Sequence, residues 1–162
     1  YSRGDERSQE LAKVFGAPFS VAKAPIQKSF RKIALEHDKP ALIFEGGESQ
    51  RYDAASISYG LAGLDRLLSY LEMVPGETAG QPYLRQHFTH QSWVRSPKAG
   101  LFLWEKSSGD QVEKGEEMGW INDPYGSKDS KAVKASHTGY IIGHSNAAVV
   151  NQGDALFHIA YE

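Results

Sequence analysis

The hydrophobic and polar positions in the first part of the chain follow helical and strand periods in turn. A helix is predicted after Asp5, which is a good N-cap, and it should end at residues 16–18, Gly-Ala-Pro. A short strand over residues 19–22 follows, and then a second helix over residues 27–36, which Pro40 prevents from continuing. The positions expected to face the core from these two helices are Leu11, Val14, Phe15, Phe30, Ile33 and Ala34.

The next segments predict a buried strand and a long helix. Residues 41–44, Ala-Leu-Ile-Phe, form a continuous apolar run of the length expected for a strand covered on both faces. A helix from about residue 54 to 73 follows, and the order helix, strand, helix, strand, helix indicates an α/β layer. Residues 74–82 are rich in proline and glycine and are interpreted as a linker. The positions of the long helix expected to face inward are Ile57, Leu61, Leu64, Leu67, Leu68 and Leu71.

The last part of the chain repeats itself. Residues 94–102 match residues 133–141, and the two copies stay in step because 133 − 94 and 139 − 100 both equal 39. Each copy contains short alternating strands that end in glycine turns. One copy is too short to bury an apolar face alone, so two halves related by a pseudo-dyad are expected to pack together. The pattern resembles the barrel-sandwich hybrid of biotinyl and lipoyl domains over roughly residues 94–161.

The hairpin between the two copies lacks the lysine motif of a cofactor carrier. Carrier domains of this type flank their lysine as Met-Lys-Met or Asp-Lys-Ala, and neither sequence occurs in residues 122–131. Lys128 and Lys131 are therefore interpreted as solvated loop lysines. The all-β domain is expected to be a scaffold, with the chemistry upstream of it.

Composition narrows the classes of function. The chain has 162 residues and a net charge of −2 with scattered Lys and Arg, which argues against a nucleic-acid partner. No apolar stretch is long enough to cross a bilayer, so no membrane partner is expected. The absence of cysteine excludes disulfides and thiolate chemistry and favours a cytoplasmic location, without excluding export. The chain opens on Tyr1 with no signal-peptide layout, and it is expected to begin inside a longer protein.

Glu45 is the first candidate for chemistry. It follows the predicted strand at its carboxyl end, where open α/β sheets place their ligand crevices. Gly46 and Gly47 come next and would let another group approach closely. The position suits a general base, but a strand-end acid that only caps the following turn is the more frequent outcome. Both interpretations stay open on the pattern alone.

Two stretches carry a family resemblance. Residues 28–34, Lys-Ser-Phe-Arg-Lys-Ile-Ala, and residues 39–47, Lys-Pro-Ala-Leu-Ile-Phe-Glu-Gly-Gly, occur in this order before a β-rich domain. Together they are similar to the second half of the catalytic domain in the succinylglutamate desuccinylase/aspartoacylase family, relatives of the zinc carboxypeptidases. The resemblance implies a partial zinc-carboxypeptidase-like α/β layer as the C-terminal part of a catalytic domain over residues 1–74. A linker over 75–86 and a β barrel-sandwich domain over 87–162 would follow.

The resemblance also implies a reaction. In that family a zinc ion held by His, Glu and His activates a water, and a strand-end glutamate acts as general base for amide cleavage. Glu45 matches that glutamate, and Arg31 falls at the position of an arginine that binds the substrate carboxylate. The implied substrate is a small N-acyl amino acid. The competing interpretation of Arg31 is an exposed helix arginine paired with Glu36 or with solvent.

The zinc ligands of the family have no counterpart in this sequence, because no histidine is followed by glutamate three residues later. The resemblance therefore implies Zn²⁺ ligands upstream of this chain, in the N-terminal half of the same protein. His87 and His90 have a spacing that a helix could use for one metal, but beside a linker this pair is a weak signal. The other histidines are assigned to a turn, for His37, and to the β domain, for His137, His144 and His158.

Two functional hypotheses follow. In the first, the chain is the C-terminal portion of a zinc-dependent amidohydrolase acting on a small N-acyl amino acid, and the isolated chain is inactive because it lacks the metal ligands. In the second, it is a noncatalytic module whose β domain mediates assembly or shields a partner's site. The sequence leaves open the acyl group of the substrate and whether the protein is a homo-oligomer.

Overall fold

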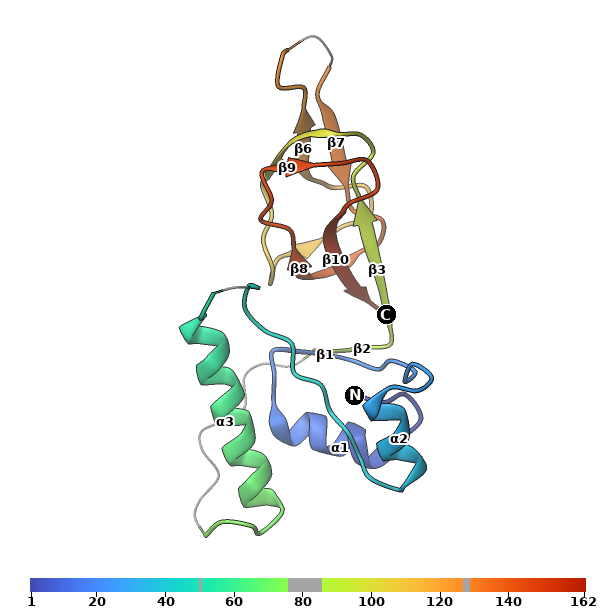
Figure 1. The fold of residues 1–162 in the computed structure, drawn as a ribbon, viewed down its shortest axis with the longest axis vertical. Coiled ribbons are helices and arrows are strands. Elements are labelled where there is room, and N and C mark those ends of the chain that lie inside the picture. The colour runs from blue at the N-terminus through green and yellow to red at the C-terminus, as the bar shows by residue number, and fades with distance from the viewer. Residues whose placement is uncertain (50, 76–85, 127–128) are drawn as a thin grey trace. The chain divides into compact units, whose positions relative to one another are not determined.

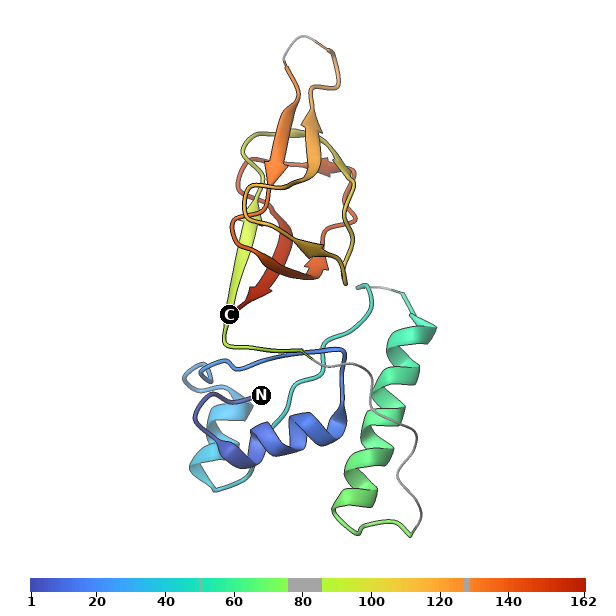
Figure 2. The same cartoon turned by 180° about the vertical axis from the view of Figure 1, so that it is seen from behind.

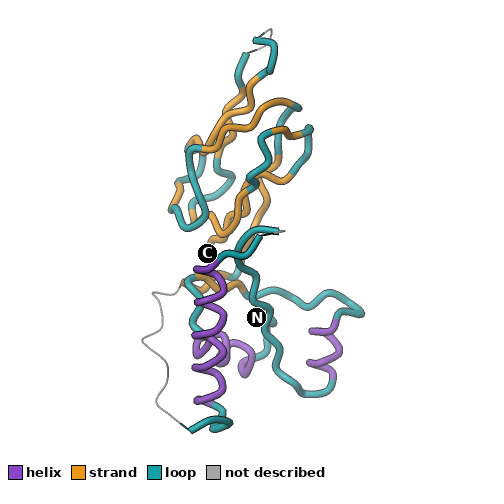
Figure 3. The backbone as a smooth tube through the Cα atoms, turned by 60° about the vertical axis from the view of Figure 1, so that its left-hand side comes forward, coloured by secondary structure: helices purple, strands orange, loops and turns teal. Residues whose placement is uncertain are grey.

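The computed structural model describes residues 1–49, 51–75, 86–126 and 129–162 (Figure 1). The chain forms two compact units, Tyr1–His87 and Phe88–Glu162. Within the described residues, all helices lie in the first unit, and the second consists of strands and loops (Figure 3). The linker predicted over residues 75–86 falls almost entirely outside the described residues. In the part of the chain that the structure describes, no helix has the length and apolar character needed to cross a membrane.

Helix α1 (Glu6–Phe15) begins and ends where the sequence predicts. At its N-terminus the side chain of Asp5 accepts a hydrogen bond from the backbone N–H of Ser8. At its C-terminus Gly16 adopts the left-handed conformation, with φ of 77°, and donates its backbone N–H to the carbonyl of Ala12. Both ends of the helix are therefore set by residues in or next to it.

Helix α3 (Ala54–Tyr70) packs against α1 through a close approach at Gly63. A Cβ atom at Gly63 would lie 2.5 Å from Cε2 of Phe15, so the phenyl ring leaves no room for a side chain there. Arg66 is buried beside this contact, and its Nε donates to the carbonyls of Val14 and Phe15 at 3.2 and 3.1 Å. A cation at a helix C-terminus satisfies the last carbonyls and complements the helix dipole.

The inward faces predicted for the other helices are wrong at most positions. Helix α2 (Phe30–Glu36) starts three residues later than predicted, Phe30 is 86% exposed, and Arg31 is its buried residue. Helix α3 turns its glycine side to α1, because only that side allows the close approach to Phe15. Of the six residues predicted to face inward, Leu67 and Leu68 are half-buried, whereas the other four are exposed, namely Ile57, Leu61, Leu64 and Leu71.

Residues 41–44 do not form the predicted buried strand. Ile43 and Phe44 are 57% and 42% exposed, and in the described residues no backbone hydrogen bond joins residues 42–44 to another segment. A strand needs neighbours on its edges. Strand β1 (Phe19–Val21), close to its predicted span, pairs instead with β2 (Gln86–Phe88) in a two-stranded sheet. The first unit is thus mixed α/β, but the central strand of the predicted layer is not formed.

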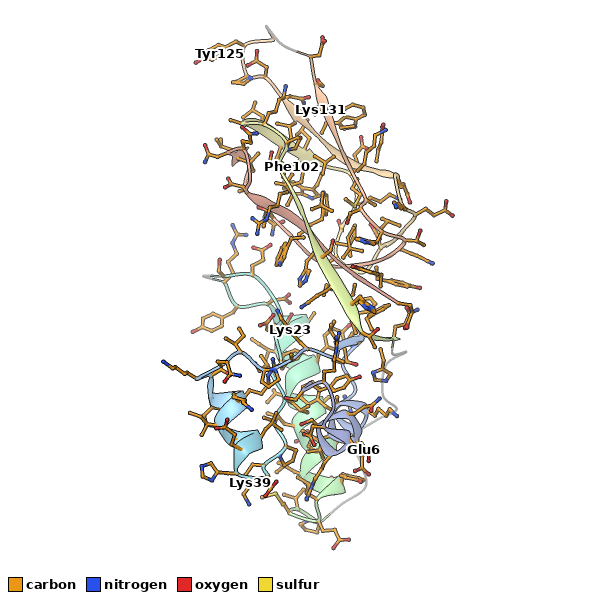
Figure 4. All side chains as sticks on the ribbon, turned by 90° about the vertical axis from the view of Figure 1, so that its right-hand side faces the viewer. Glu6, Lys23, Lys39, Phe102, Tyr125 and Lys131 are labelled. Atoms are coloured by element: carbon orange, nitrogen blue, oxygen red, sulfur yellow. The ribbon has the colours of Figure 1, made fainter. Side chains whose placement is uncertain are left out.

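The second unit contains two four-stranded sheets, ordered β3-β10-β8-β5 and β7-β6-β4-β9. Their strands pair in antiparallel fashion throughout and do not close into a barrel. The two sheets share one buried core (Figure 4). The strands are β3 (His90–Arg95), β4 (Gly100–Trp104), β5 (Gln111–Val112), β6 (Glu117–Asn122), β7 (Lys131–Lys134), β8 (Gly139–His144), β9 (Val149–Val150) and β10 (Ala155–Tyr161).

The sequence repeat relates the two sheets to each other. A shift of 39 residues carries β3, β4, β5 and β6 onto β7, β8, β9 and β10 in order, and it converts the strand order of one sheet into that of the other. Core residues correspond as well, Phe102 with Ile141 and Met118 with Phe157. Each sheet therefore takes two strands from each copy, as packed repeat halves require. The closer likeness to biotinyl and lipoyl domains stays a prediction.

The hairpin of β6 and β7 extends beyond the other strands of its unit (Figures 1 and 2). Tyr125 lies at its end with an exposed ring (Figure 4). Lys131 is exposed, as predicted, but it belongs to β7 rather than to a loop. Lys128 lies outside the described residues.

Candidate active site

Glu45 belongs to the segment of residues 41–47, whose first residue is hydrogen-bonded to α1. Ser8 of α1 is fully buried, and its hydroxyl accepts a hydrogen bond from the backbone N–H of Ala41 at 3.0 Å. The same hydroxyl donates to the carboxylate of Asp5, which caps α1. One buried serine therefore joins the helix cap to the chain that leads to Glu45.

The segment is seated on α3 on both sides of Glu45. The ring of Phe44 lies 5.3 Å, between centroids, from that of Phe15, and a Cβ atom at Gly60 would be only 3.1 Å from it. A Cβ atom at Gly46 would lie 3.0 Å from the Phe44 ring, and Gly47 has a φ of 79° that glycine adopts readily. The two glycines approach the start of α3, since a Cβ atom at Gly46 would lie 3.2 Å from Cβ of Ser56, and one at Gly47 would lie 3.1 Å from Cβ of Asp53.

Asp53 caps α3 directly after this segment. Its Oδ1 accepts hydrogen bonds from the backbone N–H groups of Ala55 at 2.9 Å and Ser56 at 3.2 Å, and its Oδ2 accepts one from the Ser56 hydroxyl at 3.1 Å. These bonds, the Ser56 backbone bond first, lower the pKa of Asp53 below its ordinary value. Asp53 is therefore a structural anion and a poor proton acceptor.

The carboxylate of Glu45 is exposed, and no hydrogen bond or ion pair holds it within the described residues. Its neighbour Glu48, by contrast, is paired with Arg51 at 3.6 Å. Glu45 makes no capping hydrogen bond in the described residues, and the residue that caps α3 is Asp53. The arrangement thus presents one unpaired carboxylate on an anchored segment, where it is available to accept a proton.

Arg31 is only 9% exposed although it lies on a short surface helix. Its Nη2 donates to the carbonyl of Ala24 at 3.1 Å, whereas its buried Nε has no partner in the described part of the chain. Glu36 is paired with Lys32 at 3.3 Å, so the interpretation of Arg31 as an exposed arginine paired with Glu36 is wrong. No hydrogen bond or ion pair joins Arg31 to Glu45 in the described residues.

No ion pair neutralises the charge of Arg31 in the described residues. A buried guanidinium without a carboxylate neighbour is costly, and its planar fork matches a carboxylate. The site of Arg31 therefore suits a small carboxylate ligand.

The histidines do not assemble a metal site in the described residues. His87 is in β2 and hydrogen-bonds to Ser20, whereas His90 begins β3 and stacks on Tyr161 with ring centroids 5.6 Å apart. These residues are in strands, so the spacing that would serve one metal on a helix does not apply. No group of three His, Cys, Asp or Glu side chains in the described ranges could hold a metal ion.

The remaining histidines lie where the sequence places them. His37 is the C-cap of α2. In the β unit, His137 stacks on Tyr161 with centroids 3.9 Å apart, and His158 stacks on Trp93 at 4.1 Å. These rings contribute to packing within their own unit.

Sequence reasoning missed the residues that position Glu45. Ser8 follows Asp5 by three residues, which is the spacing of a helix-capping pair and could have flagged the pair. Asp53 precedes a helix-forming run and matches the preference for aspartate at N-caps. The contact of Ser8 with Ala41 had no local signal, since 33 residues separate them.

No family model matches the chain, and no curated protein does. Solved structures match its fold. A succinylglutamate desuccinylase/aspartoacylase from Rhodobacter sphaeroides aligns with a TM-score of 0.84 and 21% identity, over 97% of this chain and 50% of its own. The product-bound ectoine utilization protein EutE (DoeB) from Ruegeria pomeroyi aligns with a TM-score of 0.84 and 19% identity, over 99% of this chain and 52% of its own. An aspartoacylase family protein from Mesorhizobium loti aligns with a TM-score of 0.74 and 21% identity, over 96% of this chain and 47% of its own.

This chain spans about half the length of each of these structures. At such identities the likeness establishes the fold, and the resemblance drawn from residues 28–34 and 39–47 is confirmed at that level. The chain has the fold of one half of the succinylglutamate desuccinylase/aspartoacylase structures.

Proposed function

We propose that this chain supplies the Glu45-bearing part of a deacylase, a hydrolase that cleaves the amide bond of a small N-acyl amino acid. The shared fold supports the class of reaction. The observation that carries the proposal is the unpaired, exposed carboxylate of Glu45 on a segment fastened to Ser8 and to α3. The noncatalytic module that the sequence left as an alternative gains no support from the comparisons.

In this proposal Glu45 moves one proton twice. Its carboxylate removes a proton from water as the water oxygen bonds to the amide carbonyl carbon, and it then delivers that proton to the amide nitrogen as the C–N bond breaks. Both transfers need the carboxylate to stay in place relative to the substrate. The anchors at Ala41 and at the two glycines supply that restraint on the backbone.

Arg31 has a separate role in the proposal, which is to bind the free carboxylate of the substrate. Its Nη2 stays bonded to the carbonyl of Ala24, and this contact fixes the plane of the guanidinium. The Nε–H has no partner in the described residues, and because it is buried a ligand reaches it only if the atoms that cover it move aside.

The zinc ion that the resemblance implies does not fit the described residues, which contain no three-ligand group. We place its ligands in the N-terminal half of the same protein, outside this chain, and derive no step through the metal. The β unit is proposed to be a biotinyl- or lipoyl-like scaffold without a carrier lysine. The exchange of strands between its two repeats supports that topology.

The test is the variant Glu45→Gln in the complete encoded protein that contains this sequence, assayed with acetyl and succinyl amino acids. We expect kcat to fall at least about a hundredfold with an unchanged melting temperature, the scale for losing a general base. Glu48→Gln is the matched control and should stay near wild type, because its exposed ion pair contributes little. Activity of Glu45→Gln within a few fold of wild type would remove it from this role, and no amide hydrolysis by the wild type would refute the function.

A further inference from the structure

Strand β9 forms one edge of a sheet in the β unit. It is the last strand in the order β7-β6-β4-β9, and β4 is its only neighbour among the described residues (Figure 1). The register places Val149 opposite Leu101, and the carbonyl of Ala148 accepts a hydrogen bond from the N–H of Phe102 at 2.9 Å. Because backbone groups alternate in direction along a strand, the N–H and C=O of Val149 point away from β4. Neither group has a hydrogen-bond partner in the described residues.

The edge formed by β9 carries no charge, unlike the other sheet edges of the unit. Residues 145–153, which contain β9, include no Lys, Arg, Asp, Glu or Pro. At the opposite edge of the same sheet, β7 begins and ends with lysine. In the other sheet, edge strand β3 ends with Arg95, and edge strand β5 lies between Asp110 and Glu113. Charged residues and proline on an edge prevent another strand from pairing with it, so β9 lacks this protection.

The side chains beside this edge are apolar and exposed. Val149 is 71% exposed, and Leu101 and Leu103 of β4, on the same outer face of the sheet, are 39% and 56% exposed. A shift of 39 residues carries Leu101 onto Tyr140, whose ring lies 5.9 Å, between centroids, from the buried ring of Phe88. The outer face of the other sheet therefore has aromatic cover that β4 and β9 lack in the described residues.

The charge pattern of the edges indicates a second copy of the chain as the partner of β9. Two identical strands pair in antiparallel fashion around a two-fold axis, which places each residue opposite itself or opposite a residue equally far from the axis. A charged edge would bring like charges together in such a pair and destabilise it. Pairing of β7 with itself would bring lysines together, whereas residues 145–153 bring together only uncharged side chains.

We propose that β9 of one copy pairs with β9 of a second copy around a two-fold axis at Val149, which joins the two β7-β6-β4-β9 sheets into one continuous sheet. The N–H and C=O groups of the two Val149 residues then bond to each other, and the exposed pair of Leu101 and Val149 in one copy meets the same pair in the other. The inference goes beyond the proposed activity and does not depend on it, since it concerns assembly alone.

Charge substitutions at Val149 test the pairing in the complete encoded protein, by sedimentation over a range of concentrations. We expect the wild type to dimerise, and Val149→Lys and Val149→Glu each to associate at least about tenfold more weakly, because the two-fold axis places like charges opposite each other. Both variants should fold, since the side chain is exposed. An equimolar mixture of the two variants should dimerise again. A monomeric wild type, unchanged association of the single variants, or a mixture that stays monomeric would overturn the proposal.

Leu103→Lys is the matched control. Leu103 is exposed on the same outer face as Val149, but it belongs to β4, which lies inside the sheet rather than at its edge. The variant should dimerise like the wild type, because pairing of the β9 edges leaves this position in solvent. If Leu103→Lys dissociates the dimer as fully as Val149→Lys does, the two copies stack their sheet faces, and the edge pairing is overturned.

Amide hydrogen exchange at Val149 shows which segment pairs with β9. Exchange in the complete protein should slow at least about tenfold between a dilute, monomeric sample and a concentrated, dimeric one, because the N–H is bonded only in the dimer. Slow exchange at Val149 in the monomer would mean that another segment of the same protein pairs with β9, and it would overturn the proposal. None of these measurements uses turnover, so a failure of the proposed deacylase activity is distinguishable from a failure of this inference.

Discussion

Arg31 combines a buried guanidinium with an Nε–H that has no partner in the described residues. Burying a cation without an anion is costly, and the single bond from Nη2 to the carbonyl of Ala24 offsets only part of that cost. A ligand carboxylate would supply the missing charge and, once the atoms that cover Nε move aside, accept a hydrogen bond from it. If Arg31 had a purely structural role, its only function would be the hydrogen bond to the carbonyl of Ala24.

Arg31→Lys separates these two roles, because lysine keeps the charge but loses the fork. We expect binding of N-acyl amino acids with a free carboxylate to weaken by roughly 1.5–3 kcal/mol, or about ten- to a hundredfold in KM. A substrate analogue with a neutral amide in place of the carboxylate should be affected little. The measurement is KM for both compounds in the complete encoded protein, and an equal loss on both would make Arg31 structural.

Only part of the candidate site can be predicted from the sequence around individual residues. Glu45 and Arg31 can be selected because short stretches around them carry a pattern. The surroundings of these two residues cannot be predicted in this way, because the hydrogen bond at Ala41 is made to Ser8, which is 33 residues away. The burial of Arg31 similarly contradicts its helical position, where a long cation usually reaches solvent. Contacts distant in sequence decide the environment, and no local pattern encodes them.

Among the elements, those with local end signals are predicted well and those that need partners are not. Helix α1 has its cap residues at Asp5 and Gly16 and matches its prediction. Residues 41–44 have the composition of a central strand, but a strand forms only where another strand pairs with it. Helix α3 has the predicted period, yet periodicity does not say which neighbour the apolar side will meet, and Gly63 fixes a different side of the helix on α1.

Strand β8 offers a test of close packing between elements. A Cβ atom at Gly139 would lie 2.2 Å from the backbone oxygen of Ala160, and the equivalent Gly100 of the first copy is similarly crowded, at 2.4 Å from the oxygen of Asn122. Gly139→Ala should lower the free energy of unfolding by about 1–3 kcal/mol, since backbone must move to make room. Denaturant unfolding followed by tryptophan fluorescence measures it.

Gly143 provides the control on the same strand. A Cβ atom there would meet only the Cβ of His158 at 3.7 Å, an ordinary contact. Gly143→Ala should leave stability unchanged or raise it slightly, because alanine loses less backbone entropy than glycine on folding. If Gly139→Ala and Gly143→Ala destabilise the protein equally, crowding at Gly139 does not explain the loss of stability.

At the scale of the whole molecule, the repeat makes the β unit a single cooperative body. Each sheet draws two strands from each copy, so neither copy can fold before the other is in place. The core residues Phe102 and Phe157, one from each copy, meet edge to face with ring centroids 5.6 Å apart. The first unit is organised differently, since its helices and the segment before Glu45 leave apolar surface uncovered.

This contrast leads to a prediction for the two units. A polypeptide of residues 88–162 should fold alone and melt in one cooperative transition, because it contains both copies of the repeat and the whole of their shared core. The 162-residue chain, in contrast, should neither bind zinc tightly nor hydrolyse an N-acyl amino acid, since a catalytic zinc site needs three protein ligands in fixed geometry. Thermal melts and calorimetric titration with zinc test both parts. Submicromolar zinc affinity accompanied by turnover would place a complete ligand set within this chain, and His87 and His90 would then be the first residues to replace.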